Sequence, residues 1–407
     1  MPTTPHIGFV SSTYYPIIGG MTIYLRQLAR ALSNKGHKVS IVTRFRKHQP
    51  PSMRALHTQQ EPRVSSHEDH LAIHVISTSP SWQALLPLAH RFHYYPSTEN
   101  FAVQIFSHAF KDALLKHLKK VDVIHYSGTG RELLGFAAAQ VAQTYHLPFI
   151  ITPHIHINAW GDSLLDLKLY QQANAIIALT NTEKAHLTSL GIPENKVFVI
   201  GNGTNVTGNA QGERFRKEHN ISGPMILFMG RKMAYKGFHR LLRAMPLVWH
   251  YHPEAHFVFA GPEGSDPIPE ELENLLKKDR RVLNLPAVSD TIREELYAAC
   301  DILCVPSQAE AFGMVYLEAW RYKKPVVGLD IPTLRELIEH NQAGILCTPH
   351  ASAIAEALIR LLEKPDLRSK LGENGYRTSL RYQWPTIAQK ISNVYSHALQ
   401  QIIPSNV

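Results

Sequence analysis

Two glutamates, Glu310 and Glu318, stand eight residues apart in the segment EAFGMVYLE. A strand-like run ends near Ser307, and Gly313 is placed to start a helix whose first turn leaves backbone N–H groups unpaired. Such donors suit a phosphate, and carboxylates on either side of it would accept hydrogen bonds from neutral hydroxyls. A nucleotide sugar has this order of groups: hexose hydroxyls, a diphosphate and ribose hydroxyls. Alternatively, one glutamate caps the helix and the other is solvated.

A second set of charged residues lies in GRKMAYKG, directly after the strand-like run PMILFM. Arg231 and Lys236 flank a turn there, where a guanidinium and an ammonium could neutralise a departing diphosphate. The alternative is that both are ordinary solvated surface residues. The chain has no Asp-x-Asp pair to hold a metal, so fixed cations would have to carry the charge that develops on such a leaving group.

Histidines and glycines follow several strands of the first half. His154 and His156 come where the run FIITPH should end, and a His-x-His pair can bind a metal, although no Asp or Cys stands at a suggestive spacing. We therefore expect one histidine to line a ligand site, the other to pack, and no metal to be required. Gly19 and Gly20 would let backbone approach a ligand closely.

A partial dinucleotide fingerprint raises an alternative enzyme class. In GTGRELLGF, Gly128 and Gly130 follow the run VDVIHYS, but Leu133 occupies the place of the third glycine and the next strand carries no acid for a ribose. An NAD-dependent oxidoreductase therefore has little support.

The elements that would position these residues alternate between Val/Ile-rich runs and amphipathic segments, which predicts an α/β fold with parallel sheets. We expect two Rossmann-like domains, 1–203 and 222–383, joined by a polar Gly/Asn-rich linker over 204–221. A final helix over 384–407 has no strand after it, and residues 46–72 have no hydrophobic period, so they should form a loop or an insertion. Ligands of such sheets bind beyond the carboxyl ends of the strands, and two facing domains would form one cleft.

Composition narrows the class of protein. With 407 residues, 44% of them hydrophobic and 18% charged, the chain reads as a globular protein with no apolar run long enough to span a membrane. Its start lacks the features of a signal peptide, which favours a cytoplasmic location. The net charge of +9 favours anionic partners, but the scattered Lys and Arg do not favour nucleic acid. The three cysteines match neither a disulfide framework nor a zinc pattern, and the 24 histidines have no single explanation.

Taken together, these motifs resemble glycosyltransferase family 4, a retaining family with the GT-B fold. The resemblance covers nearly the whole chain. YYPIIGGMTIYLRQLARALSNKGHKVSIVT is similar to the opening of the family, GRKMAYKGFHRLLRAM to the start of its second domain, and PSQAEAFGMVYLEAWRYKKPVV to its Glu-x7-Glu signature.

The resemblance implies a role for each matching position. Arg231 and Lys236 would hold the donor diphosphate with help from the backbone of Phe312, Gly313, Met314 and Val315. Glu310 would orient the transferred sugar, and Glu318 would accept from the ribose hydroxyls. In the first domain, His154 would lie near the reacting sugar and Gly20 in the loop that closes over the phosphates.

The family retains anomeric configuration, by a same-face attack that needs no protein nucleophile; a covalent role for Glu310 is the lesser hypothesis. The resemblance thus implies a metal-independent transfer of a hexose from a nucleotide diphosphate sugar to a hydroxyl of a glycan or lipid-linked acceptor, without a cofactor, and a last helix that crosses back to the first domain. The basic amphipathic segment FSHAFKDALLKHLKK would allow peripheral contact with an anionic membrane, although ordinary packing explains it as well.

Some residues depart from the family pattern. Ala311 stands where a glycine is common. IPTLRE, which ends at Glu336, stands in place of a Gly-Gly-x-x-Glu pattern, and IGNGTNV replaces the usual hinge sequence. The donor base and sugar are therefore not transferable. A catalytically silent sugar-binding protein of the same fold is the remaining alternative, although the charged residues it would have lost are all present.

Overall fold

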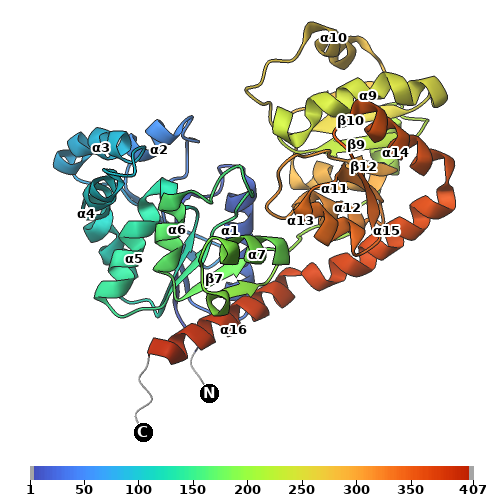
Figure 1. Ribbon diagram of the computed structural model, residues 1–407. Coiled ribbons are helices and arrows are strands. Elements are labelled where there is room, and N and C mark those ends of the chain that lie inside the picture. Colours follow the sequence, from blue (N-terminus) through green and yellow to red (C-terminus); the bar gives the residue numbers. More distant parts are fainter. Residues whose placement is uncertain (1–3, 403–407) are drawn as a thin grey trace. The chain divides into compact units, whose positions relative to one another are not determined.

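The computed structural model describes residues 4–402, which form two compact units. The first unit combines the chain up to Gly203 with the segment from Trp384 onward, and the second comprises Thr204–Gln383. Figure 1 labels the main elements of both units.

The first unit is built on an eight-stranded sheet in the order β3-β4-β2-β1-β5-β6-β7-β8. All neighbouring strands are parallel except β3 and β4. Its strands are β1 (Ile7–Thr13), β2 (Val39–Phe45), β3 (Val64–Glu68), β4 (Leu71–Val75), β5 (Val123–Ser127), β6 (Phe149–Thr152), β7 (Ala175–Ala178) and β8 (Val197–Val199). Its helices are α1 (Gly20–Asn34), α2 (Met53–Thr58), α3 (Pro80–Phe92), α4 (Glu99–Leu118), η1 (Gly130–Glu132), α5 (Leu134–Thr144), α6 (Leu164–Gln171), α7 (Asn181–Ser189), η2 (Glu194–Lys196) and α16 (Trp384–Ile402).

The second unit has a six-stranded, fully parallel sheet in the order β11-β10-β9-β12-β13-β14. Its strands are β9 (Met225–Met229), β10 (His256–Ala260), β11 (Val282–Leu285), β12 (Ile302–Cys304), β13 (Val326–Leu329) and β14 (Gly344–Cys347). Its helices are α8 (Glu213–Glu218), η3 (Ala234–Lys236), α9 (Phe238–Tyr251), α10 (Glu270–Lys278), α11 (Asp290–Ala299), α12 (Met314–Arg321), α13 (Pro332–Leu334), η4 (Arg335–Glu339), α14 (Ala351–Glu363), α15 (Pro365–Ser379) and η5 (Leu380–Tyr382).

The central strands are covered on both faces, which explains their continuous apolar runs. Every residue of β1, β2, β5 and β9 is buried. In the second unit, α9 packs against α14, and α12 packs against α15, as Figure 1 shows. The predicted α/β class, with a parallel sheet in each half, is confirmed.

The segment 46–72 is more ordered than the sequence predicts, because it contains α2, β3 and the start of β4. The polar strand β3 pairs antiparallel with β4 at the edge of the sheet, where all five of its residues remain at least partly exposed. Asp69 and His70 form the two-residue connection, both with positive φ (49° and 67°). Such turns are usually recognised by Asn-Gly or Asp-Gly, so Asp-His gave no hairpin signal.

The expected linker over 204–221 is part of the second unit and contains α8. Arg216 of α8 donates to the carbonyl oxygens of Ala299 (2.8 Å) and Gly223 (2.5 Å), and its guanidinium lies 3.2 Å from the Asp301 carboxylate. These contacts tie the segment to the sheet, and composition alone does not reveal them.

The last helix, α16, packs against α1 in the first unit. Its Tyr395 hydroxyl hydrogen-bonds to Nδ1 of His125 (2.6 Å), a fully buried residue of β5 whose Nε2 bonds to Thr152 Oγ1 (2.8 Å). Among the described helices, none combines the length and the apolar character needed to cross a membrane.

We predict that His125 makes the first unit sensitive to acid. Burial lowers the pKa of His125 to about 3, while in the unfolded chain it stays near 6.5, so the unfolded state binds more protons between these values. The stabilisation is complete above pH 6.5 and declines as the pH falls, by about 2 kcal/mol at pH 5. Urea unfolding of the wild type and of His125→Gln, which does not titrate, should therefore give a shallower pH slope in the variant. Parallel slopes would contradict this prediction.

Candidate functional site

The second unit reverses its strand order between β9 and β12. From β9, strands β10 and β11 extend to one side, and β12, β13 and β14 to the other. Ligands of open parallel sheets bind beyond the carboxyl ends of the strands at such a point. The segment 230–237 follows β9 and the segment 305–313 follows β12. Both charged motifs therefore lie where this sheet is expected to bind a ligand.

Backbone contacts hold these two segments together. The carbonyl oxygen of Tyr235 accepts from the backbone N–H of Gln308 (2.7 Å) and from the Ser307 hydroxyl (3.3 Å). Gly237 has φ +81°, and a Cβ there would lie 2.0 Å from the carbonyl oxygen of Pro306. The approach is thus possible only because residue 237 is a glycine.

This approach brings together the predicted Lys236 and Glu310. Lys236 Nζ donates to Glu310 Oε1 over 2.8 Å, and the two side chains are only 18% and 7% exposed. Charge-assisted hydrogen bonds of this kind are among the stronger ones in proteins. The pair fixes the direction of one carboxylate oxygen and leaves the other oxygen to accept from a hydroxyl.

The helix after this loop begins as the sequence predicts. Gly313 has φ +97° and precedes Met314, the first residue of α12. Phe312 is buried, with its ring 5.3 Å from that of Tyr382. The first turn, which includes Met314 and Val315, carries N–H groups that the helix itself does not pair.

Glu318 is buried inside α12, and two residues of α11 restrain it. Its Oε2 accepts from the Tyr297 hydroxyl (2.6 Å), and its Oε1 lies 3.9 Å from Nη1 of Arg293. Burial first, and then the Glu318 carboxylate, raise the pKa of Tyr297 well above its ordinary value, so the phenol remains a donor. The Glu318 carboxylate is therefore oriented by its two partners.

Arg231 is half-buried, and the neighbouring Lys232, which the sequence analysis passed over, is buried. Lys232 Nζ donates to Glu263 Oε1 (2.6 Å) and to the carbonyl oxygen of Leu285 (2.8 Å). Lys232 thus connects the segment after β9 to the segment after β10 and to the last residue of β11, and its ammonium already has two acceptors.

The other two predicted residues, Gly20 and His154, lie in the first unit. Gly20 begins α1, and one turn later the Tyr24 ring packs edge-on against the His154 ring at 4.8 Å. His154 has φ +55°, and its Nε2 is hydrogen-bonded to Ser127 Oγ (3.0 Å). Burial lowers the pKa of His154 to about 3, so the imidazole is neutral and suited to hydrogen bonding with a hydroxyl.

The two histidines of the His-x-His pair have different surroundings. The ring of His156 stacks on that of Trp160 at 3.7 Å, whereas His154 packs against Tyr24. Within residues 4–402, neither belongs to a group of three possible metal ligands.

The glycines of the partial dinucleotide fingerprint have structural reasons to be glycine. A Cβ at Gly130 would lie 2.5 Å from the carbonyl oxygen of Leu165, and one at Gly128 would lie 2.8 Å from Glu132 Oε1. Close packing within the protein therefore explains these glycines without a dinucleotide.

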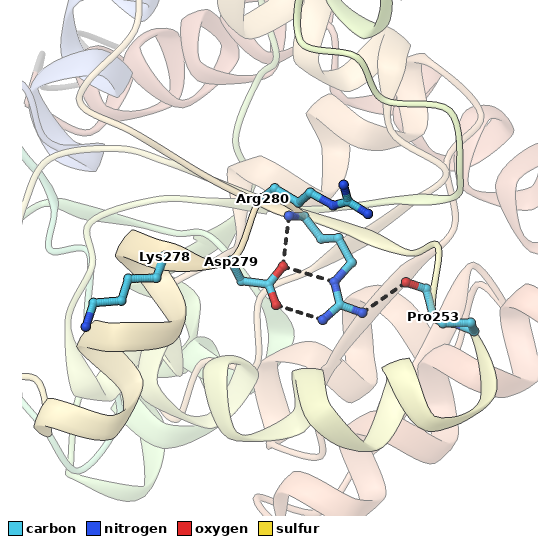
Figure 2. A pocket seen from close by; sticks show the side chains of 5 residues that line it. Pro253, Lys278, Asp279 and Arg280 are labelled. Carbon is cyan, nitrogen blue, oxygen red and sulfur yellow. Dashed lines mark hydrogen bonds and ion pairs between the residues drawn. The ribbon is translucent and has the colours of Figure 1, made fainter.

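A hollow on the second unit does not coincide with the predicted residues. Figure 2 shows it lined by Pro253, Lys278, Asp279 and Arg280. Arg281 also lines it. Its guanidinium donates to the Asp279 carboxylate and lies 3.8 Å from the Trp249 ring centre. Since β11 begins at the next residue, the hollow lies at the amino end of that strand, opposite to the ligand-binding edge.

Sequence reasoning missed the residues that hold the predicted ones in place: Arg293, Tyr297, Lys232, Glu263, Ser127 and Tyr24. Arg293 and Tyr297 are four residues apart and thus share a face of α11, but many helical pairs have this spacing. Only the packing of α11 beside α12 identifies their partner.

Two sequence families match the chain. The family described as "Glycosyl transferases group 1" matches residues 211–378, and that described as "Glycosyltransferase Family 4" matches residues 18–207. An uncharacterized glycosyltransferase of Methanocaldococcus jannaschii is 27% identical, over 97% of this chain and 99% of its own. A D-inositol 3-phosphate glycosyltransferase of Xylanimonas cellulosilytica is 26% identical, over 94% and 93%.

Solved structures resemble this chain over nearly its whole length. Sucrose-phosphate synthase from Thermosynechococcus elongatus has a TM-score of 0.74 at 22% identity, covering 97% of this chain and all of its own. The Anabaena protein HepE, solved in complex with UDP-glucose, has a TM-score of 0.72 at 20% identity, covering 97% and 100%. At these identities the likeness shows a common fold.

We predict that Gly237→Ala destabilises the second unit by about 3 kcal/mol, because it adds a steric clash with Pro306 to the backbone strain of a positive φ. Gly36→Ala is the matched control, since Gly36 has φ +91° but no atom within 4 Å of its would-be Cβ, and it should cost about 1 kcal/mol. Urea unfolding of both variants measures the difference. Equal losses would show that the contact with Pro306 does not matter.

Proposed function

Because the chain belongs to glycosyltransferase family 4 and has the GT-B fold, we propose that it transfers a hexose from a nucleotide diphosphate sugar to a hydroxyl of a glycan or lipid-linked acceptor, with retention and without a metal. The observation that carries the proposal is the Lys236–Glu310 pair, which lies beside the first turn of α12 at the reversal point of the second sheet.

In the proposed donor site, different residues bind the hexose, the diphosphate and the ribose of the nucleotide sugar. Glu310 would accept from hydroxyls of the hexose, with Lys236 holding its other oxygen in place. Arg231, Lys236 and the N–H groups of Phe312, Gly313, Met314 and Val315 would bind the diphosphate. Glu318, restrained by Tyr297, would accept from the ribose hydroxyls. This arrangement assigns neutral hydroxyls to the acids and anionic oxygens to the cations.

The proposed reaction breaks the bond between the anomeric carbon and the β-phosphate oxygen and forms a bond from the acceptor oxygen on the same face. The acceptor proton passes to the leaving phosphate oxygen, so no protein base is consumed. Arg231 and Lys236 would stabilise the charge on that oxygen, and His154 would bind a hydroxyl near the reacting carbon as a neutral imidazole. The carboxylate of Glu310 is ion-paired, which favours an orienting role over a nucleophilic one.

Two features of the comparisons guide the choice of substrates. HepE was solved with UDP-glucose, so UDP-sugars are the first donors to test. Several relatives are D-inositol 3-phosphate glycosyltransferases, so an inositol phosphate belongs in the acceptor panel beside glycans and lipid-linked sugars. The exposed Leu85, Leu88, Tyr94, Tyr95 and Phe101 on and after α3 would support peripheral contact with a membrane that carries such an acceptor.

We predict that Lys236→Met lowers the rate of nucleotide release from UDP-, GDP- or ADP-sugars by roughly 100-fold or more, because a fixed cation at the leaving group is lost. Lys277→Met is the control, since Lys277 forms an exposed ion pair with Glu273 on α10 and should leave the rate unchanged. The initial rate of the wild type should be insensitive to EDTA. Release that requires added metal would contradict metal independence, and donor binding without release would indicate a silent sugar-binding protein.

We predict that Tyr297→Phe raises the KM for the donor about five-fold with little change in kcat, because one hydrogen bond to the ribose-binding Glu318 is lost. Tyr322→Phe is the matched control: it removes a bond of similar length (2.7 Å) from Glu294, a residue outside the proposed site. Steady-state kinetics of both variants measure KM and kcat for the donor. An unchanged KM in Tyr297→Phe would show that the hydrogen bond from Tyr297 to Glu318 does not contribute to donor binding.

A further inference from the structure

Three histidines of the first unit converge beside α2, and one of them, His57, lies in the segment 46–72 that the sequence predicts as a loop or an insertion. His57 lies in the last turn of α2, His90 in the last turn of α3, and His93 directly after α3. Each offers a ligand atom within 4.8 Å of the other two, and this is the one such group of three in the described part of the chain. His57 and His93 are buried and His90 is half-buried.

Hydrogen bonds to backbone orient two of the three rings. His57 Nε2 lies 2.8 Å from the carbonyl oxygen of Arg131, so this nitrogen carries the proton. His93 Nδ1 bonds in the same way to the carbonyl oxygen of His90. Lone pairs are therefore left on Nδ1 of His57 and Nε2 of His93. Metal-bound histidines almost always donate their other ring N–H to a carbonyl or carboxylate in this manner.

The third ring completes the cluster. His90 Nδ1 lies 3.1 Å from His57 Nδ1, a separation between two nitrogens that either one proton or one shared cation would explain. In a tetrahedral zinc site with Zn–N bonds near 2.0–2.1 Å, two ligand nitrogens lie about 3.4 Å apart. The His57–His90 separation is close to this value and all three ligand atoms lie within 4.8 Å of one another, so ring rotations could bring three ligands to one ion.

Burial, more than the charges around the cluster, favours the neutral imidazole that a metal ion requires as a ligand. Burial lowers the pKa of His57 to about 3, and burial is also the main cause that lowers the pKa of His90 and of His93. The cations Arg44, Arg54 and Arg131 act in the same direction on His57, His90 and His93 respectively. They also disfavour a bound cation, so any affinity must come from the imidazole lone pairs.

We propose that His57, His90 and His93 bind one divalent transition-metal ion, zinc foremost, with water as the fourth ligand. Imidazole is a preferred ligand of zinc, copper and nickel, and three protein ligands leave one position open to solvent. The ion would cross-link α2 to the end of α3 and so stabilise the contact between these two helices. This role is structural and is independent of the proposed transfer reaction.

The test uses the full chain without an affinity tag, stripped with a chelator and titrated with Zn²⁺ and with Co²⁺ as a spectroscopic probe. We expect one equivalent per chain, a visible Co²⁺ spectrum typical of four-coordinate nitrogen ligation, and a higher unfolding temperature with Zn²⁺. His90→Gln should weaken binding by roughly 100-fold or more, since even the loss of an outer partner of a ligand costs 10- to 100-fold. His90 is the half-buried member, so this variant should fold.

A matched control separates the cluster from the many other histidines. His74 stacks on His117 at 4.0 Å in a pair outside the cluster, and His74→Gln should keep full binding. Absence of stoichiometric binding by the wild type would overturn the proposal and leave a hydrogen-bonded histidine cluster. Binding that persists in both His90→Gln and His93→Gln would overturn it as well. His90→Gln also allows the EDTA test of catalysis to be repeated without the metal site.

Discussion

The ion pair between Lys236 and Glu310 is the interaction on which the second unit's candidate site depends. It forms because Gly237 allows the turn after β9 to approach the backbone of Pro306. The same turn accepts hydrogen bonds from Ser307 and Gln308, so the loop after β12 has little freedom. Since the pair is largely buried, solvent screens it weakly, and it orients a carboxylate before any ligand arrives.

Glu318, the second acid of the motif, is held by different contacts. Glu318 lies inside α12 and depends on Tyr297 and Arg293 of the neighbouring helix rather than on a lysine. A neutral donor at 2.6 Å and a cation at 3.9 Å restrain its two oxygens. The two glutamates therefore differ in environment although they belong to one sequence signature, and this difference agrees with the distinct sugar-binding roles proposed for them.

Buried histidines connect several elements of the first unit. His125 joins the sheet to α16, His154 meets Tyr24 of α1, and His57 meets two histidines at the end of α3. Each imidazole is kept neutral by burial and can both donate and accept in a small space. Part of the high histidine count thus has a structural explanation: these histidines make buried polar contacts between helices and strands.

The sequence by itself determined the α/β class, the two parallel sheets and the two charged motifs, because buried parallel strands impose continuous apolar runs and each motif directly follows one of them. It could not reveal the hairpin at Asp69 and His70, whose turn lacks glycine, or the order within 204–221, which rests on contacts of Arg216. Only the tertiary structure decided that Lys236 pairs with Glu310, that Tyr297 restrains Glu318, and that three histidines from α2 and α3 meet. The contacts between different elements join residues 21 to 74 positions apart, and such distances in sequence are closed by packing, which no local pattern encodes.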